Sequence, residues 1–279
     1  GTTLLGADDK AGIALCVEAA RYAIEHPEIP HAKLCFAITP DEEISRGTVN
    51  FNIEEFGAQY AYTFDGDELG GFETETFNAA MVNVHFEGLN VHPGSAKGKM
   101  VNALRMAMDF ISRLPAESVP EKTELYEGFF HPLAISGAVR GVDLRMLIRD
   151  HDNTKFEDRM EYVRKVVEEM NKVWGNRVTV DIKVQYHNLK NYLDKHPMVC
   201  DIAREAYRRA GVEIHEKPVR GGTDGARLSA RGLPTPNLFT GGMNYHGVYE
   251  CLSVTGLERA LDVAKQLVAM SAEVKSLSK

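Results

Sequence analysis

Hydrophobic positions recur with two different periods along the first part of the chain. Apolar side chains three or four positions apart over 10–25 predict a helix. Its core-facing positions are expected to be Ile13, Val17, Ala20 and Ile24. Short continuous apolar runs at 33–39 and 61–65, each followed by turn residues, predict buried strands. This alternation of helix and strand favours a mostly parallel sheet covered by helices.

From about residue 79 the pattern changes to strict alternation of apolar and polar residues, which is typical of half-buried strands. Strands are predicted at 82–88, 133–139, 142–150 and 177–186, and helices at 100–113 and 154–173. The first of these helices is expected to bury Leu104, Ala107, Met108 and Ile111. The order β-α-β-β-α-β is that of a split βαβ, ferredoxin-like unit.

The alternation of helices and short strands resumes after this unit, with helices predicted at 196–210 and from 256 to about 274. The sequence therefore predicts an α/β domain interrupted by a ferredoxin-like α+β domain. The expected segments are 1–78 and 188–279 for the α/β domain and 79–187 for the inserted domain.

Composition narrows the classes of partner. A net charge of −8 over 279 residues argues against a nucleic-acid partner, and no apolar run is long enough to predict a membrane span. The four cysteines are widely spaced without a CxxC pair, and Cys16 and Cys35 are expected to be small core residues. Such cysteine usage favours a reducing cytoplasm.

Several carboxylates and one histidine share a position, because each ends a predicted strand or lies in a loop just after one. They are Asp8, Asp9, Glu42, Glu43, Asp65 and His246. The carboxyl ends of strands form the ligand crevice of open α/β sheets. Carboxylates that converge there repel one another unless a cation neutralises them, and zinc accepts both carboxylate and imidazole ligands. The pattern therefore predicts a metal site.

The neighbouring residues Glu42 and Glu43 suit two different roles. Adjacent side chains in an extended loop diverge, so Glu43 can bind metal while Glu42 faces the attacking water as a general base. Taken singly, each motif also has a simpler interpretation. "DEE" is a common start of a helix, "GADDKAG" is a turn with an N-cap, and "GGTDG" is an anion-binding nest or a flexible turn.

Taken together, "LLGADDKAGIA", "TPDEEI", "TFDG", "NVHPG", "RGGTDGA" and "NYHG" make the chain resemble the co-catalytic dizinc peptidase family that includes carboxypeptidase G and the aminoacylases. The resemblance covers essentially the whole chain. It implies a zinc domain interrupted by a lid and dimerisation domain. It also implies a cytoplasmic, homodimeric aminopeptidase that removes the N-terminal residue from tripeptides and uses two zinc ions.

The resemblance also implies a role for individual residues. Asp8 matches the carboxylate that bridges the two ions, with a peptide bond to Asp9 that tends to be cis. Glu42 matches the general base. The remaining metal ligands are expected to be Glu43, Asp65 and the terminal histidine, His246.

Three further residues are implied to act on the substrate. His92 matches a lid histidine that reaches the site of a neighbouring subunit and steadies the oxyanion. Arg220 resembles a contact for the substrate carboxylate, and Arg149 is a second candidate for that contact.

One family feature has no counterpart in the sequence. The family's other histidine ligand lies in an "HxD" motif upstream of the bridging aspartate, and only seven residues precede Asp8. We therefore expect the chain to be the back portion of a longer peptidase, inactive alone. The alternatives are a related dizinc dipeptidase, an N-acyl amino acid deacylase, or a non-catalytic metal-binding and dimerisation module.

Overall fold

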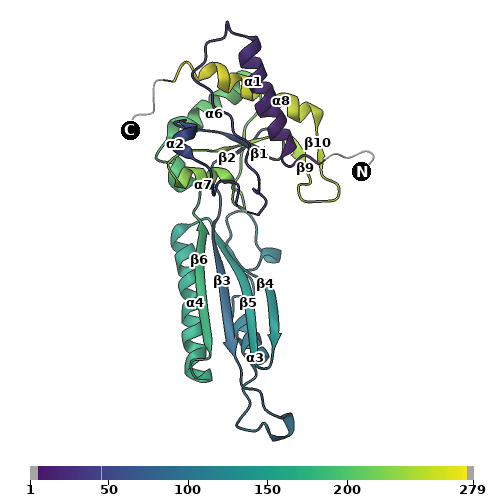
Figure 1. Ribbon diagram of the computed structural model, residues 1–279, viewed down its shortest axis with the longest axis vertical. Coiled ribbons are helices and arrows are strands. Elements are labelled where there is room, and N and C mark those ends of the chain that lie inside the picture. Colours follow the sequence, from purple (N-terminus) through teal and green to yellow (C-terminus); the bar gives the residue numbers. More distant parts are fainter. Residues whose placement is uncertain (1–5, 45, 275–279) are drawn as a thin grey trace. The chain divides into compact units, whose positions relative to one another are not determined.

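The computed structural model describes residues 6–44 and 46–274. They divide into two compact units. The split unit contains the described residues up to Thr76 together with those from Leu189 onward. The central unit contains residues 77–188. Figure 1 shows the helices and strands of each unit, and the two are described separately below.

The split unit is built on a four-stranded sheet in the order β1-β8-β2-β7. Its strands are β1 (Thr63–Gly66), β2 (Gly71–Glu73), β7 (His215–Glu216) and β8 (Asn237–Phe239). β1 pairs with β8 in parallel, as does β2 with β7, whereas β2 and β8 are antiparallel. The expected α/β character is confirmed, with a mixed sheet.

The three long helices of the split unit are α1 (Lys10–Glu25), α6 (Pro197–Ala210) and α8 (Val254–Met270). α8 contacts both α1 and α6, and α1 also contacts β1. The core between helices and sheet includes Phe72, Tyr207, Leu238, Phe239 and Ala260, none more than 1% exposed. The shorter elements are α2 (Ile53–Phe56), α5 (Lys190–Leu193), α7 (Asp224–Ala230), β9 (Gly242–Met243) and β10 (Cys251–Leu252).

Helix α1 has the predicted bounds, but the predicted core face is wrong. Its buried residues are Ala11, Gly12, Leu15 and Ala19, while Ile13, Val17 and Ile24 are exposed and Ala20 is half-buried. The physical reason is close packing on the sheet. A Cβ at position 12 would lie 2.0 Å from the carbonyl oxygen of Phe64, so only the face with small side chains can approach β1.

The strand predicted at 33–39 is also wrong. The segment has no regular structure, and Phe36 and Ile38 are exposed. No strand among the described residues pairs with it, and an apolar run becomes a strand only when another backbone accepts and donates its hydrogen bonds. Cys35 in this segment and Cys16 on α1 are half-buried, so neither is the core residue expected from the sequence.

The central unit is a four-stranded antiparallel sheet in the order β4-β5-β3-β6. Its strands are β3 (Asn78–Glu87), β4 (Phe129–Ala138), β5 (Gly141–Asp150) and β6 (Val178–Tyr186). Helices α3 (Ala103–Arg113) and α4 (Asn153–Trp174) share one core with the buried side of the sheet (Figure 1). Short 3-10 turns occupy η1 (Pro93–Ser95) and η2 (Pro120–Lys122). The ferredoxin-like prediction is confirmed.

Helix α3 is rotated relative to its prediction. It buries Ala103, Met106, Ala107 and Phe110, whereas Leu104, Met108 and Ile111 are exposed. The helix is apolar on two faces, and the contact with the sheet decides which face is covered. The uncovered face leaves an apolar stripe on the surface of the central unit.

Helix α4 is amphipathic along its 22 residues, with Phe156, Met160, Val163 and Met170 among its buried side chains. Within 6–44 and 46–274, no helix combines the length and apolar character needed to cross a membrane.

Candidate metal centre

The first part of the candidate site is the loop that leads into α1. Asp9 is the N-cap of the helix, and its Oδ1 accepts a hydrogen bond from the backbone N–H of Gly12 at 2.9 Å. The Asp8–Asp9 peptide bond is cis, as the family resemblance implies. The Asp8 side chain is only 10% exposed. The Asp9 side chain is therefore used to cap the helix, whereas the Asp8 side chain faces the candidate site.

The second part is the turn that carries Glu42 and Glu43. The N–H of Arg46 donates to the carbonyl oxygen of Asp41 at 2.9 Å and closes this turn. The segment that follows is anchored by Arg231, whose guanidinium donates to the carbonyl oxygens of Thr48 at 2.6 Å and Phe51 at 2.5 Å. Two charge-assisted hydrogen bonds thus hold the chain just after the two glutamates.

Asp65 lies in β1, near its carboxyl end. Its N–H donates to Oδ1 of Asn237 at 3.1 Å, and the same oxygen accepts from the Thr63 hydroxyl at 2.8 Å. Since Asn237 belongs to β8, the pairing of β1 with β8 determines where Asp65 lies.

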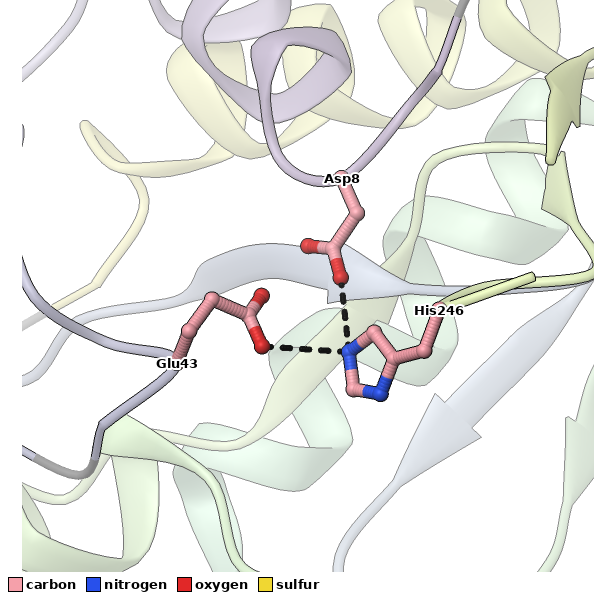
Figure 2. Close-up of side chains that lie close together, drawn as sticks. All are labelled: Asp8, Glu43 and His246. Atoms are coloured by element: carbon pink, nitrogen blue, oxygen red, sulfur yellow. Dashed lines mark hydrogen bonds and ion pairs between the residues drawn. The ribbon is translucent and has the colours of Figure 1, made fainter. Parts of the chain in front are cut away.

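His246 completes the cluster from a tight turn after β9. Its Nε2 lies 3.1 Å from Oδ2 of Asp8 and 3.1 Å from Oε2 of Glu43. Figure 2 shows the imidazole nitrogen facing both carboxylates. One ligand atom from each of the three side chains lies within 4.8 Å of the others. Carboxylate oxygens and an imidazole nitrogen at this spacing are a donor set that fits zinc.

The carboxylates around this cluster have raised pKa values. Burial, together with the charges of Asp9 and Glu42, raises the pKa of Asp65 to about 9. Burial and the charge of Asp8, opposed by the Gly12 N–H, raise the pKa of Asp9 to about 7. Crowded, partly buried carboxylates raise one another's pKa values in this way, and a bound divalent cation would lower them.

The two glutamates share this electrostatic environment. Burial and the charges of Asp224 and Glu43 raise the pKa of Glu42 to about 7. Burial and a hydrogen bond with Asp8 raise the pKa of Glu43. The residues expected from the sequence to form the site, Asp8, Glu42, Glu43, Asp65 and His246, therefore interact with one another in the folded chain.

The structure places the three substrate candidates in separate elements. Arg220 is half-buried, three residues before Thr223, the N-cap of α7. His92 is exposed in the central unit, where it caps η1 and accepts a hydrogen bond from the N–H of Gly94 at 3.1 Å. Arg149 lies half-buried on β5. Their roles stay predictions.

Two residues of the site were missed by sequence reasoning. Glu250 accepts hydrogen bonds from the backbone on either side of the cluster, and those bonds lower its pKa. Asp224 begins α7, accepts a hydrogen bond from Thr39 at 3.3 Å and raises the pKa of Glu42. The only sequence signal for Glu250 is its place four residues after His246, at the far end of the same turn.

Comparisons with known proteins agree with this architecture. The family described as peptidase dimerisation domain matches residues 74–175. Peptidase T of Clostridium perfringens (strain 13) is 50% identical over 274 residues, which are 98% of this chain and 68% of that protein. Peptidase T of Geobacillus kaustophilus is 48% identical over 97% of this chain and 66% of that protein.

Two solved structures share the fold. The aminopeptidase PepT from Bacillus cereus superposes with a TM-score of 0.83 at 28% identity, covering 97% of this chain and 73% of that one. A tripeptidase from Staphylococcus aureus gives a TM-score of 0.81 at 23% identity, covering 96% and 72%. Fold and site define a metallopeptidase with an inserted dimerisation domain. The chain belongs to the peptidase T family.

Proposed function

We propose that the chain forms the metal-holding part of a zinc aminopeptidase that removes the N-terminal residue from tripeptides. The observation that carries the proposal is the convergence of Asp8, Glu43 and His246, with Glu42 beside them. Relatives called peptidase T, half of whose residues are identical to this chain where they align, support the substrate class.

We assign two zinc ions to the complete active site. Asp8, Glu43, Asp65 and His246 would hold these ions on this chain. The raised pKa values of Glu43 and Asp65 support this assignment, because carboxylates that are crowded together favour the binding of a divalent cation. When bound, zinc supplies Lewis-acid chemistry and lowers the pKa of water.

Glu42 would move the proton in this reaction. Its pKa of about 7 suits a general base, because such a group is deprotonated often enough to accept a proton and basic enough to hold it. Glu42 takes a proton from the attacking water and returns it to the leaving amine. Its turn neighbour Glu43 then remains free to ligate.

Three residues would handle the substrate. We propose that Arg220 binds the substrate carboxylate, with Arg149 as the second candidate, because a guanidinium binds a carboxylate through two parallel hydrogen bonds. His92 would steady the oxyanion in the site of a neighbouring subunit. Its exposed position at the N-cap of η1 supports this role, since it leaves the imidazole accessible to another chain.

A homodimer through the central unit follows from the same proposal. The match to a peptidase dimerisation domain covers most of this unit. Its surface carries the apolar stripe of α3 (Leu104, Met108 and Ile111) and exposed apolar side chains on the edge strand β4, including Leu133 and Ile135. A second copy that covered them would remove apolar area from water.

We place the reaction in the cytoplasm. Cys16, Cys35, Cys200 and Cys251 are all free thiols, which is the usual state in a reducing compartment.

Glu42→Gln tests the proposal, with Glu54→Gln on the exposed face of α2 as the matched control. We expect zinc content to stay at the level of the unchanged chain. The tripeptide turnover that the chain shows together with an added segment carrying an HxD motif should fall by about 10²-fold or more. Zinc per chain is measured by elemental analysis, and turnover on a panel of dipeptides, tripeptides and N-acyl amino acids.

Each result of the panel decides between the alternatives. Preference for dipeptides or N-acyl substrates would replace the tripeptidase by a related dipeptidase or deacylase. Bound zinc with no turnover on any substrate, even with the HxD-bearing segment added, would favour the non-catalytic metal-binding module. Normal turnover by Glu42→Gln would contradict the assigned base.

A further inference from the structure

We propose that Glu250 is a positioning residue that joins the loops of Asp8 and His246 through their backbones, so that the two side chains meet at one metal. This inference rests on the proposed function. Oε1 of Glu250 accepts hydrogen bonds from the N–H groups of Ala7 at 2.5 Å and Asp8 at 2.9 Å. Oε2 accepts from the N–H of His246 at 3.2 Å.

Both oxygens of this carboxylate are therefore engaged with backbone, and they bridge segments about 240 residues apart in the chain. A carboxylate has acceptor positions on each oxygen, so one side chain can satisfy all three donors. This use distinguishes Glu250 from Asp8 and Glu43, whose oxygens face the imidazole of His246.

The close approach depends on Gly6. A Cβ at this position would lie 2.9 Å from Oε1 of Glu250, inside the distance that real side chains tolerate. The glycine therefore leaves room for the carboxylate beside the Asp8 loop. Lys10 closes the same loop by donating from Nζ to the carbonyl oxygen of Gly6 at 2.9 Å.

His246 has particular need of such a restraint. Its side chain is 72% exposed, and its backbone is left-handed, with φ 61°. Packing against neighbours therefore does little to orient it. The hydrogen bond that the His246 N–H donates to Glu250 restrains this residue, and the N–H groups of Ala7 and Asp8 donate to the same carboxylate from the other loop. Groups that orient metal ligands in this way influence metal affinity without touching the metal.

The test uses the full chain with Glu250→Gln, and Glu258→Gln on the exposed surface of α8 as the control. Glutamine keeps the size of the side chain but replaces one acceptor oxygen by an NH₂ donor, which cannot accept from a backbone N–H. We expect the Zn²⁺ affinity, measured by competition with a chromophoric chelator, to fall about 10- to 100-fold. The control should match the unchanged chain.

Two further readouts separate positioning from general stability. The visible spectrum of the Co²⁺-loaded Glu250→Gln chain at saturation should differ from that of the unchanged chain, because the ligand geometry changes. In metal-free protein, the amide protons of Ala7, Asp8 and His246 should exchange faster, while those of the α8 core keep their protection. Gly6→Ala, which displaces the carboxylate without removing its charge, should reproduce these effects if Glu250→Gln does not fold.

Equal Zn²⁺ affinity and an unchanged Co²⁺ spectrum in Glu250→Gln would overturn the inference while leaving the proposed function intact. If the unchanged chain itself binds no Zn²⁺, the proposed function fails. The amide exchange of metal-free protein then decides whether Glu250 joins the loops: faster exchange at the three amides supports it, and unchanged exchange refutes it.

Discussion

Nε2 of His246 lies 3.1 Å from Oδ2 of Asp8, although 238 residues separate them in the sequence. One belongs to the loop before the first described helix and the other to the turn before the last helix. The entire central unit lies between them in the chain. The proposed metal centre therefore depends on the two segments of the split unit folding together.

His246→Ala should weaken Zn²⁺ binding by about 100-fold or more, because it removes the only imidazole of the described cluster. Competition with a chelator measures the change. His31→Ala is the matched control, since His31 is exposed and bonds only to the carbonyl oxygen of Ala32 in the contacts described. Equal affinity in His246→Ala would remove this histidine from the ligand set.

Zn²⁺ binding should release protons near neutral pH. Asp65, with a pKa of about 9 in the metal-free fold, is protonated at pH 7 and must lose its proton to ligate. Because the pKa is raised, protons compete with the metal, and the apparent affinity should rise about tenfold per pH unit for each proton released. This rise should end near the pKa of Asp65.

Calorimetry in two buffers of different ionisation enthalpy counts those protons. On binding Zn²⁺, the Asp65→Asn variant should release one proton fewer than the unchanged chain at the same pH. An affinity that stays constant from about pH 6 to about pH 8 would contradict the raised pKa values.

Arg231→Met should loosen the segment that follows Glu42 and Glu43. The change removes the guanidinium donor from both carbonyl oxygens. The Thr48 oxygen still accepts from the N–H of Phe51 at 3.1 Å, so the larger loss falls on the carbonyl oxygen of Phe51. Unfolding free energy should fall by about 1–3 kcal/mol. Cleavage after Arg46 by trypsin should become faster.

Arg231→Lys should recover part of that loss, because lysine can still donate to one of the two carbonyl oxygens. Arg259→Met, at a largely exposed position on α8, should change neither quantity. Unaltered cleavage in Arg231→Met would show that the segment is held by other contacts.

The central unit contains a buried ion pair with a predictable response. Nε of Arg159 donates to Oδ2 of Asp150 at 2.7 Å, and the Asp150 side chain is 1% exposed. Arg159→Met should reduce unfolding free energy by about 3–5 kcal/mol, because it leaves a buried carboxylate without its partner.

The double variant Asp150→Asn with Arg159→Met should lose less than Arg159→Met alone, since no unpaired charge remains. Lys155→Met on the exposed face of α4 controls for the loss of a positive charge. Urea denaturation measures all three, and a double variant less stable than Arg159→Met would contradict the explanation.

The orientation of α1 predicts a contrast between two residues of that helix. Leu15→Ala should reduce unfolding free energy by about 2–5 kcal/mol, because Leu15 is 2% exposed. Ile24→Ala should cost less than about 1 kcal/mol, because Ile24 is 79% exposed. The opposite order would restore the helix face expected from the sequence.

The residue pattern was sufficient for the sheet of the central unit. Strict alternation placed Val82, Val84 and Phe86 on the buried face of β3, and the order of elements led to the ferredoxin-like sheet. Alternation is informative there because one face of each strand lies against helices and the other faces water. The apolar residues, which recur at every second position, therefore identify the buried face of each strand.

The pattern was insufficient where a segment is apolar on more than one side. Helices α1 and α3 each offer two apolar faces, and the faces containing Ile13 and Met108 are exposed. The run at 33–39 has strand composition but no pairing partner among the described residues. Such choices depend on what lies next to the segment in space, which periodicity does not contain.

Apart from the strand predicted at 33–39, the sequence by itself determined the types of element, their order, and the carboxylates and histidine that form the cluster, because local propensity and motif spacing are properties of the chain. Only the tertiary structure decided which helix faces are covered and that Glu250 links Asp8 to His246. The physical reason is that a hydrogen bond or a buried contact between distant segments depends on distances in space, and those exist only after the chain has folded.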